Sequence, residues 1–299
     1  MSQRSFRALL TERQQAARSL VCVGLDPLLE KAPKPIQASL RNKELAQLAL
    51  TQWMNAIVDA TAPFASMFKP QHAHWEAIPG GVEALKTVIK RIRDNYPTIP
   101  VFMDCKRGDI DRTQKQYAVA HLDLELTDGM NFNGYMGKDT LKSLIDAKRP
   151  GRALVGLGRT SNKEAWEIQD AKMADGRPVW EFMVEKLFAW STELGVLEDA
   201  GIVMGAAHDD PQDPGRIYHW HLSRARDIVG EKMWFLIPGI GTQGGYVTKT
   251  IKAAYRGPGT IAINSSSGII FASQEADYMA AAAAAAEKLR DEIHAAIAS

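Results

Sequence analysis

Short, nearly continuous runs of apolar residues alternate along the chain with longer amphipathic stretches. Runs of this kind are typical of strands that are buried on both faces. There are eight of them: Leu20–Gly24, Ala65–Lys69, Val101–Asp104, Met130–Asn133, Ala153–Leu157, Gly201–Gly205, Trp234–Pro238 and Thr260–Asn264. Strands that alternate with helices form βαβ units, so the pattern predicts an α/β fold with a parallel sheet. Eight units favour a closed (β/α)8 TIM barrel, and an open doubly wound sheet is the alternative.

The amphipathic stretches predict the helices that connect these strands. Pro and Gly mark several of the boundaries, as in Ile78-Pro79-Gly80-Gly81. The stretches are Leu45–Ala60, Gly81–Asn95, Thr113–Thr127, Lys138–Ala147, Trp180–Leu194 and Tyr218–Val229. We also expect an N-terminal helix at about residues 2–18 and an Ala-rich closing helix at about residues 276–298. Neither a Gly/Ser-rich linker nor an internal repeat divides the sequence, so we expect residues 1–299 to form a single domain.

Composition narrows the class of protein. Of 299 residues, 45% are hydrophobic and 24% are charged, which is ordinary for a soluble globular protein. The formal net charge of +1 gives no indication of a nucleic-acid partner or of a membrane surface. No apolar run approaches the ~18 residues of a membrane span, and the N-terminus lacks the apolar segment of a secretory signal. Cys22 and Cys105 have no CxxC spacing, which fits a reducing compartment. We therefore expect a cytoplasmic protein, with an organelle as the open alternative.

Polar or ionisable residues follow all eight apolar runs. The C-terminal ends of barrel strands form the active-site face, so these residues are candidates for the site. In chain order they are Asp26, Lys69, Asp104 with Lys106, Asn133, Arg159-Thr160-Ser161-Asn162, His208-Asp209-Asp210, the Gly-rich segment 239–245, and Asn264-Ser265-Ser266-Ser267-Gly268. A polar residue at the end of one strand is ordinary, but polar groups at all eight ends indicate a functional site.

The third strand end carries most of the chemical information. Asp104 and Lys106 are two residues apart, so on a strand both side chains face the barrel mouth while Cys105 points to the helices. The structural alternative is a solvated ion pair at a strand end. Lys69 at the neighbouring strand end favours an active site instead, because lysines and carboxylates would then alternate. At an effective dielectric of ~20, each contact of opposite charges at ~4 Å is worth about 4 kcal/mol before desolvation.

Two further patterns are candidate ligand sites. The glycines at 239, 241, 244 and 245 allow an anion to approach the backbone, and the loops after strands seven and eight usually bind phosphate in this fold. A tight loop without a ligand is the alternative. His72 and His74 have a spacing that on a strand could bind a metal. No third ligand has convincing spacing nearby, so we expect no metal site.

The segment from Asp104 to Thr113 resembles the DxKxxDIxxT signature of the orotidine 5′-phosphate decarboxylase family. Related sugar-phosphate decarboxylases share DxKxxD but not the remainder. Further segments are similar to the longer, bacterial-type branch of the family: 23–27, 68–70, 133–137, 160–162 and 238–245. The resemblance extends from about Leu20 to Ala272, which is nearly the whole chain.

This resemblance implies decarboxylation of orotidine 5′-phosphate to uridine 5′-phosphate, the last step of de novo pyrimidine synthesis. Asp104 would lie against the substrate carboxylate, and Lys106 would deliver the proton to C6 as CO₂ leaves. Asp26 and Lys69 would contact the ribose hydroxyls, with Lys69 also part of the charged network. The family needs neither a metal nor an organic cofactor.

The resemblance also implies a homodimer whose active sites are shared across the interface, with Asp109 and Thr113 reaching into the neighbouring site. Ser161 would contact the pyrimidine from a loop that closes over it, and Asn133 would contact the substrate. In some organisms this activity is fused to orotate phosphoribosyltransferase. A partner of that kind is therefore possible for this chain.

The phosphate end departs from the family pattern. Gly241, Gln243 and the adjacent amides would bind phosphate, but Ser267 stands where an arginine normally grips it. Either the hydroxyls of Ser266 and Ser267 suffice, or another cation such as Arg159 substitutes, or phosphate is bound more weakly. Two alternatives follow for the function: a Mg²⁺-dependent 3-keto-sugar-phosphate decarboxylase, and a non-catalytic nucleotide-binding relative.

Overall fold

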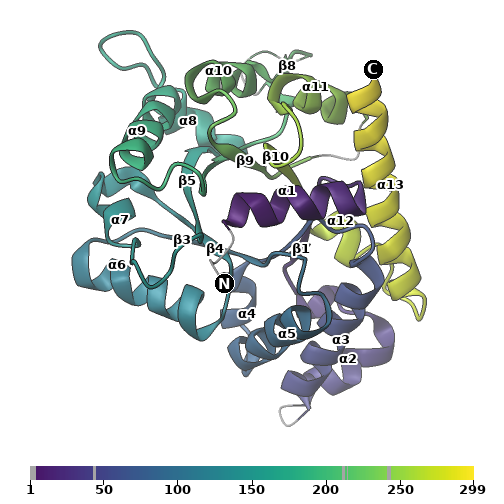
Figure 1. Ribbon diagram of the computed structural model, residues 1–299. Helices are drawn as coiled ribbons and strands as arrows, with labels where there is room; N and C mark the ends of the chain where they lie inside the picture. The colour runs from purple at the N-terminus through teal and green to yellow at the C-terminus, as the bar shows by residue number, and fades with distance from the viewer. Residues whose placement is uncertain (1–4, 43–44, 211–212, 214, 241–243) are drawn as a thin grey trace.

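The protein is an eight-stranded parallel barrel surrounded by helices (Figure 1). The structure is a computed structural model that describes residues 5–42, 45–210, 213, 215–240 and 244–299. The barrel strands are β1 (Val21–Leu25), β2 (Met67–Pro70), β3 (Phe102–Arg107), β4 (Gly129–Phe132), β5 (Ala153–Arg159), β6 (Ala200–Met204), β9 (Trp234–Ile237) and β10 (Ile261–Ser265). This arrangement confirms the predicted TIM barrel, and each strand overlaps one of the eight apolar runs.

The strands pair in the order β2-β1-β10-β9-β6-β5-β4-β3. Parallel bridges between Phe68 and Val101 and between Gln71 and Asp104 join β2 to β3 and close the ring. β1, β2, β4, β6 and β9 are buried at every position. Burial on both faces explains why these strands read as continuous rather than alternating apolar runs.

Helices cover the outside of the barrel. They are α1 (Phe6–Ala17), α2 (Lys34–Arg41), α3 (Ala46–Thr61), α4 (His72–Glu76), α5 (Gly81–Asn95), α6 (Asp111–Ala118), α7 (Asp139–Lys142), α8 (Trp166–Gln169), α9 (Val179–Glu193), α10 (Trp220–Val229), α11 (Gly244–Ala254), α12 (Ser267–Ile270) and α13 (Tyr278–Ala298). Short 3-10 turns lie at Leu29–Lys31, Gly134–Met136 and Lys163–Ala165. In α5, Leu85, Val88 and Ile92 recur at helical spacing and are all buried, which fixes the face that packs on the barrel.

Three helix predictions need correction. The stretch Lys138–Ala147 is helical only over α7, because the chain tightens after Lys142 into turns with i→i+3 bonds. The stretch Thr113–Thr127 begins earlier, at α6, and continues as a π-helix, η2 (Val119–Leu124). Tyr218 does not begin a helix: it pairs with His208 in a hairpin of β7 (His208–Asp209) and β8 (Ile217–Tyr218).

The end of the barrel where the strands begin is closed by α1, which lies across it (Figure 1). Ser5 caps this helix by accepting from the backbone amide of Ala8. Phe6 follows at the first position and stacks on Trp234 with ring centroids 5.1 Å apart. In a TIM barrel the packing at this end contributes to stability, and the active site lies at the opposite end.

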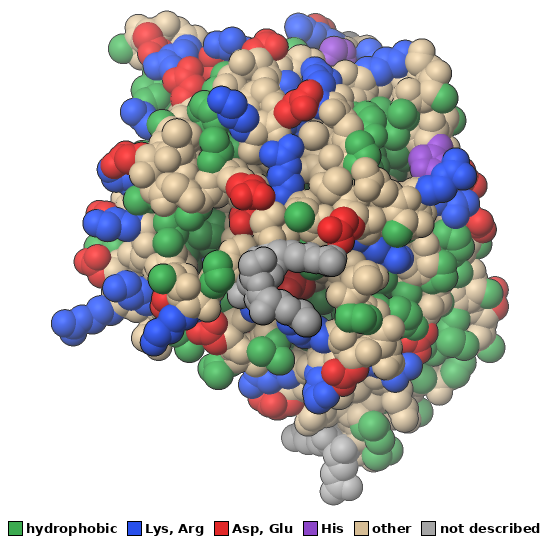
Figure 2. All heavy atoms as spheres, viewed as in Figure 1, with side chains coloured by type: hydrophobic (Ala, Val, Ile, Leu, Met, Phe, Trp, Pro, Cys, Tyr) green, Lys and Arg blue, Asp and Glu red, His purple; other side chains and the backbone are tan. Residues whose placement is uncertain are grey.

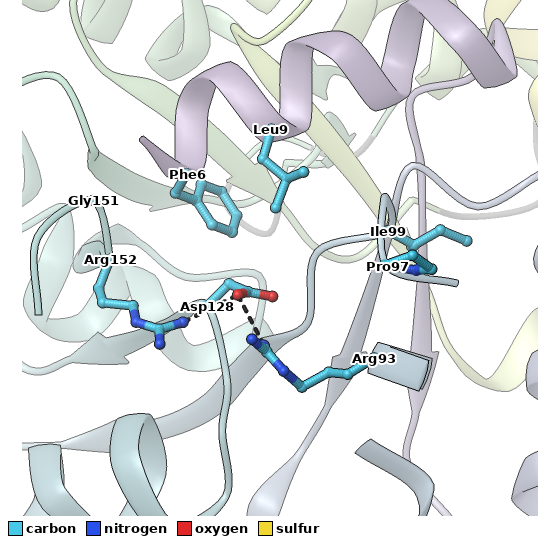
Figure 3. A pocket seen from close by; sticks show the side chains of 8 residues that line it. All are labelled: Phe6, Leu9, Arg93, Pro97, Ile99, Asp128, Gly151 and Arg152. Atoms are coloured by element: carbon cyan, nitrogen blue, oxygen red, sulfur yellow. Dashed lines mark hydrogen bonds and ion pairs between the residues drawn. The ribbon is translucent and has the colours of Figure 1, made fainter. Parts of the chain in front are cut away.

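A small cavity of about 230 Å³ lies beside Phe6 at the closed end. Arg93 and Arg152 approach from two sides and both donate to Asp128 Oδ1, at 3.1 and 3.0 Å (Figure 3). One carboxylate therefore bridges two guanidinium groups, and the cluster keeps a net positive charge.

The surface at this end carries mixed charge. Seen from the side of Figure 1, Lys and Arg side chains are interspersed with Asp and Glu (Figure 2). This pattern agrees with the formal net charge of +1. Among the described residues, no helix combines the length and the apolar character that crossing a membrane requires.

Candidate active site

Three charged side chains meet where β2 and β3 end, as the sequence predicted. Lys69 Nζ donates to Asp104 Oδ2 at 3.0 Å, and Lys106 Nζ donates to Asp104 Oδ1 at 2.7 Å. Asp26, after β1, is the next carboxylate, with Oδ1 3.9 Å from Lys69 Nζ. Lysines and carboxylates therefore alternate along one line from β1 to β3.

This network fixes the charge state of its buried members. Burial alone would raise the pKa of Asp104, but Lys69, Lys106 and a hydrogen bond from Asn131 lower it well below its ordinary value. Burial alone would lower the pKa of Lys69, but Asp104 and Asp26 raise it above its ordinary value. Asp104 is consequently a carboxylate and Lys69 an ammonium throughout the neutral range.

Asn131 on β4 organises the site, and the sequence analysis missed it. Its Oδ1 accepts from the backbone amides of Cys105 and Lys106, at 2.8 and 2.6 Å. Its Nδ2 donates to Asp104 Oδ1 at 2.7 Å. Lys106 has a left-handed backbone (φ +46°), which is costly for a residue with a side chain, and the amide oxygen of Asn131 helps to hold it there.

The network opens into a cavity of about 280 Å³ at the barrel mouth. Its walls include Lys69, Asp104, Lys106, Asn131, Thr160, Ser161, Asn162, Val203, Leu236 and Pro238. Ser161 therefore lines the same cavity as the two lysines. A side chain at Gly239 (φ +84°) would bring Cβ to 2.8 Å from Ser161 Cβ, so glycine is required for this close approach.

Three other candidate residues lie away from the charged cluster. Asn133 is exposed, and its Oδ1 accepts from the backbone amide of Tyr135. Asp109 Oδ1 accepts from the amide of Ile110, while Thr113 is exposed in the first turn of α6. None of the three lines the mouth cavity. Asn131, two positions earlier and within β4, is the asparagine of this segment that reaches the charged cluster.

The serines after β10 lie beside the end of β1. A Cβ at Gly24 would approach Ser266 Oγ to 1.8 Å, so the two backbones meet there closely. Ser266 Oγ accepts from Asn264 Nδ2 at 3.3 Å, and Ser267 is exposed at the start of α12. Gly241 and Gln243 lie outside the described residues.

Arg159 is not free to replace the arginine absent at Ser267. It is 1% exposed, and its Nε and NH2 atoms donate to the two oxygens of Asp170 at 3.0 and 2.8 Å. Its guanidinium also lies over the ring of Tyr218. This pairing anchors the end of β5 beneath the Ser161 loop, so we withdraw Arg159 as the substitute cation.

The histidine prediction also needs correction. His72 begins the helix α4 rather than lying on a strand, so it shares no face with His74. The structure nevertheless brings two distant potential ligands to it, His121 and Glu125, both buried. This group could not be predicted from local spacing, because His121 lies 49 positions after His72 in the sequence.

Both cysteines are free thiols with little tendency to ionise. Cys22 on β1 is fully buried, and burial raises its pKa above the ordinary value. Cys105 points away from the mouth, half-buried, and burial raises its pKa to about 12. Since the thiolate is the reactive form, neither residue is a candidate nucleophile.

The barrel and the alternating charges at its mouth define a TIM-barrel enzyme with an acid–base site at the mouth. Comparison with known proteins identifies its family. Residues 19–285 match the model of the orotidine 5′-phosphate decarboxylase / HUMPS family. The chain therefore belongs to this family, and it is a carboxy-lyase, an enzyme that carries out a decarboxylation.

Individual relatives agree over nearly the whole length. An orotidine 5′-phosphate decarboxylase of Ralstonia nicotianae is 36% identical over 97% of this chain and 98% of the relative. The solved orotidine monophosphate decarboxylase of Leishmania donovani is 29% identical, covers 99% of each chain and has a TM-score of 0.76. The UMP synthase of the same organism is 30% identical with a TM-score of 0.77, and this chain spans 57% of it.

Proposed function

We propose that this enzyme decarboxylates orotidine 5′-phosphate to uridine 5′-phosphate, the last step of de novo pyrimidine synthesis. The observation that carries the proposal is the Lys69–Asp104–Lys106 network at the wall of the mouth cavity. The family and the names of its relatives support the substrate.

The chemistry needs a positioned cation. As the bond between C6 and the carboxylate breaks, CO₂ leaves and the electron pair remains on C6, where the ring delocalises it poorly. In our proposal the Lys106 ammonium stabilises this charge as it develops, transfers a proton to C6, and regains a proton from solvent. Because Asp104 holds the ammonium at 2.7 Å, its approach to C6 is set before substrate binds. No metal or organic cofactor takes part.

Binding of the rest of the nucleotide follows the same proposal. Asp26 and Lys69 contact the ribose hydroxyls, and Ser161 contacts the pyrimidine. Asn133 also contributes to the substrate site. Phosphate is held by Gly241, Gln243, Ser266 and Ser267 without the arginine that the family pattern would supply. Contacts remote from C6 supply the energy that orients the reacting carbon.

We further propose that residues 1–299 act as one domain in a cytoplasmic homodimer whose sites are shared, with Asp109 and Thr113 serving the neighbouring site. Thr113 is exposed and does not line the mouth cavity of its own chain, which supports this arrangement. The similarity to a UMP synthase that is much longer than this chain supports a working association with orotate phosphoribosyltransferase.

Loss of orotidine monophosphate absorbance measures the proposed reaction directly. We expect rapid turnover by the wild-type protein, and a loss on the order of a thousandfold or more in Lys106→Ala, because the proposal assigns the proton transfer to Lys106 and gives Lys69 to the ribose. Lys90→Ala, which removes an exposed lysine of α5, is the matched control. Unchanged turnover in Lys106→Ala would refute the assignment of the proton donor.

The same assay separates the alternatives. A Mg²⁺-dependent sugar-phosphate decarboxylase would lose activity in EDTA, whereas the proposed reaction continues. A non-catalytic nucleotide-binding protein would bind uridine monophosphate but leave orotidine monophosphate intact.

A further inference from the structure

A second buried polar network lies behind the mouth cavity, on the helical side of β3. Glu125 Oε1 contacts His72 Nε2 at 2.9 Å, and Glu125 Oε2 contacts His121 Nδ1 at 2.8 Å. Arg107 Nε donates to His121 Nε2 at 3.1 Å, and Arg107 NH2 lies 3.4 Å from His72 Nδ1. We call these four residues the His–Glu–Arg network. None of its side chains lines the mouth cavity, so the proposed chemistry does not use them.

Three connections of the barrel meet in this network. His72 begins α4, directly after the strand that carries Lys69. Arg107 ends β3, one residue after Lys106. His121 lies in the π-helix η2 and Glu125 follows it, at the end of the segment that begins with the DxKxxDIxxT motif. A π-helix is rare and often marks a functional site, and here it helps to bring both side chains to Arg107.

The hydrogen bonds define where the protons lie. Because Arg107 donates to Nε2 of His121, that nitrogen is an acceptor and the ring proton is on Nδ1, facing Glu125. A metal ion bound at Nδ1 would require the proton to move to Nε2, where it would face the N–H of Arg107. The positive guanidinium would also oppose a cation. The geometry thus favours a network held by protons over a metal site, although its residue types suit a metal.

Charge within the network is balanced. Burial alone would raise the pKa of Glu125, but hydrogen bonds from His121 and His72 lower it to about 2. Burial, together with His72 and Arg107, lowers the pKa of His121 despite the opposing effect of Glu125. Glu125 is therefore a carboxylate and His121 a neutral imidazole at neutral pH, and the guanidinium of Arg107 offsets the charge of Glu125. Glu76 of α4 and the ring of Tyr117 of α6 also face Arg107.

We propose that the His–Glu–Arg network is a positioning device for Lys106. It holds the side chain of Arg107 on the helical side of β3, so that the left-handed residue before it keeps its ammonium on Asp104 and aimed into the cavity. Arg107 directly follows the left-handed residue, so anchoring its side chain fixes the backbone on the C-terminal side of Lys106. This inference rests on the proposed decarboxylase function for its kinetic test.

Two substitutions of His121 distinguish its contact with Arg107 from its contact with Glu125. In His121→Gln, the amide oxygen can occupy the place of Nε2 and still accept from Arg107. In His121→Asn, the shorter amide takes the place of Nδ1, keeps the contact with Glu125 and loses Arg107. We expect kcat to fall roughly tenfold to a hundredfold in His121→Asn, with KM within about threefold of wild type. The loss should be clearly smaller in His121→Gln.

The pH dependence of kcat gives a second test, because a residue with a purely structural role would not change it. On acidification His121 gains a second proton, Nε2 becomes a donor that faces the donor of Arg107, and kcat should fall. His121→Gln has no such group and should lose this inflection. His294→Asn, on a partly exposed position of α13, is the control and should keep both kcat and the inflection.

The outcomes are distinct. If both variants at position 121 keep wild-type kcat and lower only the melting temperature, the network is structural and the proposal fails. Stoichiometric zinc in the wild-type protein, lost in His121→Asn, would overturn it by showing a metal site. If the wild type does not turn over orotidine monophosphate at all, the proposed function fails instead. Imidazole ¹⁵N NMR then tests the network separately, since it should report the proton of His121 on Nδ1.

Discussion

At the scale of single residues, the site depends on a lysine in an unusual conformation. Lys106 combines φ +46° with an ion pair to Asp104, and Asn131 contacts both the backbone of the lysine and the carboxylate. A strained residue of this kind persists only where its surroundings hold it. Asn131 therefore positions the proposed proton donor through its hydrogen bonds to the backbone of Lys106 and to Asp104.

Replacing Asn131 tests this role. In Asn131→Ala the amides of Cys105 and Lys106 lose their acceptor, so we expect kcat to fall roughly tenfold to a hundredfold with a small change in KM. Asn131→Asp restores the acceptor but places a second carboxylate beside Asp104, so the pH dependence of kcat should shift upward. Asn95→Ala, at an exposed site at the end of α5, serves as control. Wild-type kinetics in Asn131→Ala would show that Lys106 holds its conformation unaided.

The sequence could identify Lys69, Asp104 and Lys106, because each stands at a strand end in a recognisable motif. It could not identify Asn131. The predicted fourth strand, Met130–Asn133, contains two asparagines, and position within a run does not say which one faces a neighbouring strand. Only the register, in which Met103 pairs with Met130, places Asn131 beside Cys105.

At the scale of elements, apolar runs predicted all eight barrel strands, and helical periodicity gave α5 with its observed bounds. Departures occur where local hydrogen bonding differs from that of an α-helix. The segment Val119–Leu124 widens into a π-helix, and the hairpin of β7 and β8 is too short to leave a periodic signal. The His–Glu–Arg network depends on contacts between distant segments, which no local pattern encodes.

The element α6 also carries the proposed dimer chemistry, because Thr113 lies on it and Asp109 precedes it. If sites are shared, Lys106→Ala and Asp109→Ala subunits should each be inactive alone but complement when mixed. One site of each mixed dimer is then intact, so random mixing should restore about a quarter of wild-type activity. Refolded mixtures assayed for turnover give the answer. Absence of recovery, or an active monomer in sedimentation, would contradict the shared site.

At the scale of the whole molecule, the two ends of the barrel have different tasks. Aromatic packing by Phe6 and the Arg93–Asp128–Arg152 cluster close one end, and the charged cavity opens at the other. Buried ionisable groups also make the stability of the folded barrel depend on pH. His221 on α10 is fully buried, contacts the carbonyl of Gly205 at 2.7 Å and leaves Nδ1 without a partner among the described residues.

Buried groups with a lowered pKa make the free energy of unfolding decrease as the pH falls. Burial lowers the pKa of His221 to about 3, so the unfolded chain binds its proton first and stability falls as pH drops below the ordinary histidine value. The lowered pKa of Glu125, Asp104 and His121 acts in the same direction. For His221 alone, the free energy of unfolding should decrease by about 2 kcal/mol between about pH 7 and pH 5. Urea titrations of wild type and His221→Phe measure this. An equal decrease in both proteins would exclude His221 as the cause.

The two unreactive thiols have a practical consequence. Cys22 is inaccessible and Cys105 ionises only near about pH 12, so a thiol reagent at neutral pH meets very little native thiolate. A single cysteine introduced on the exposed surface, for example at Asn162 beside the mouth, can then be labelled selectively with a fluorophore. The chain thus accepts a site-specific optical reporter of nucleotide binding without first removing its own cysteines.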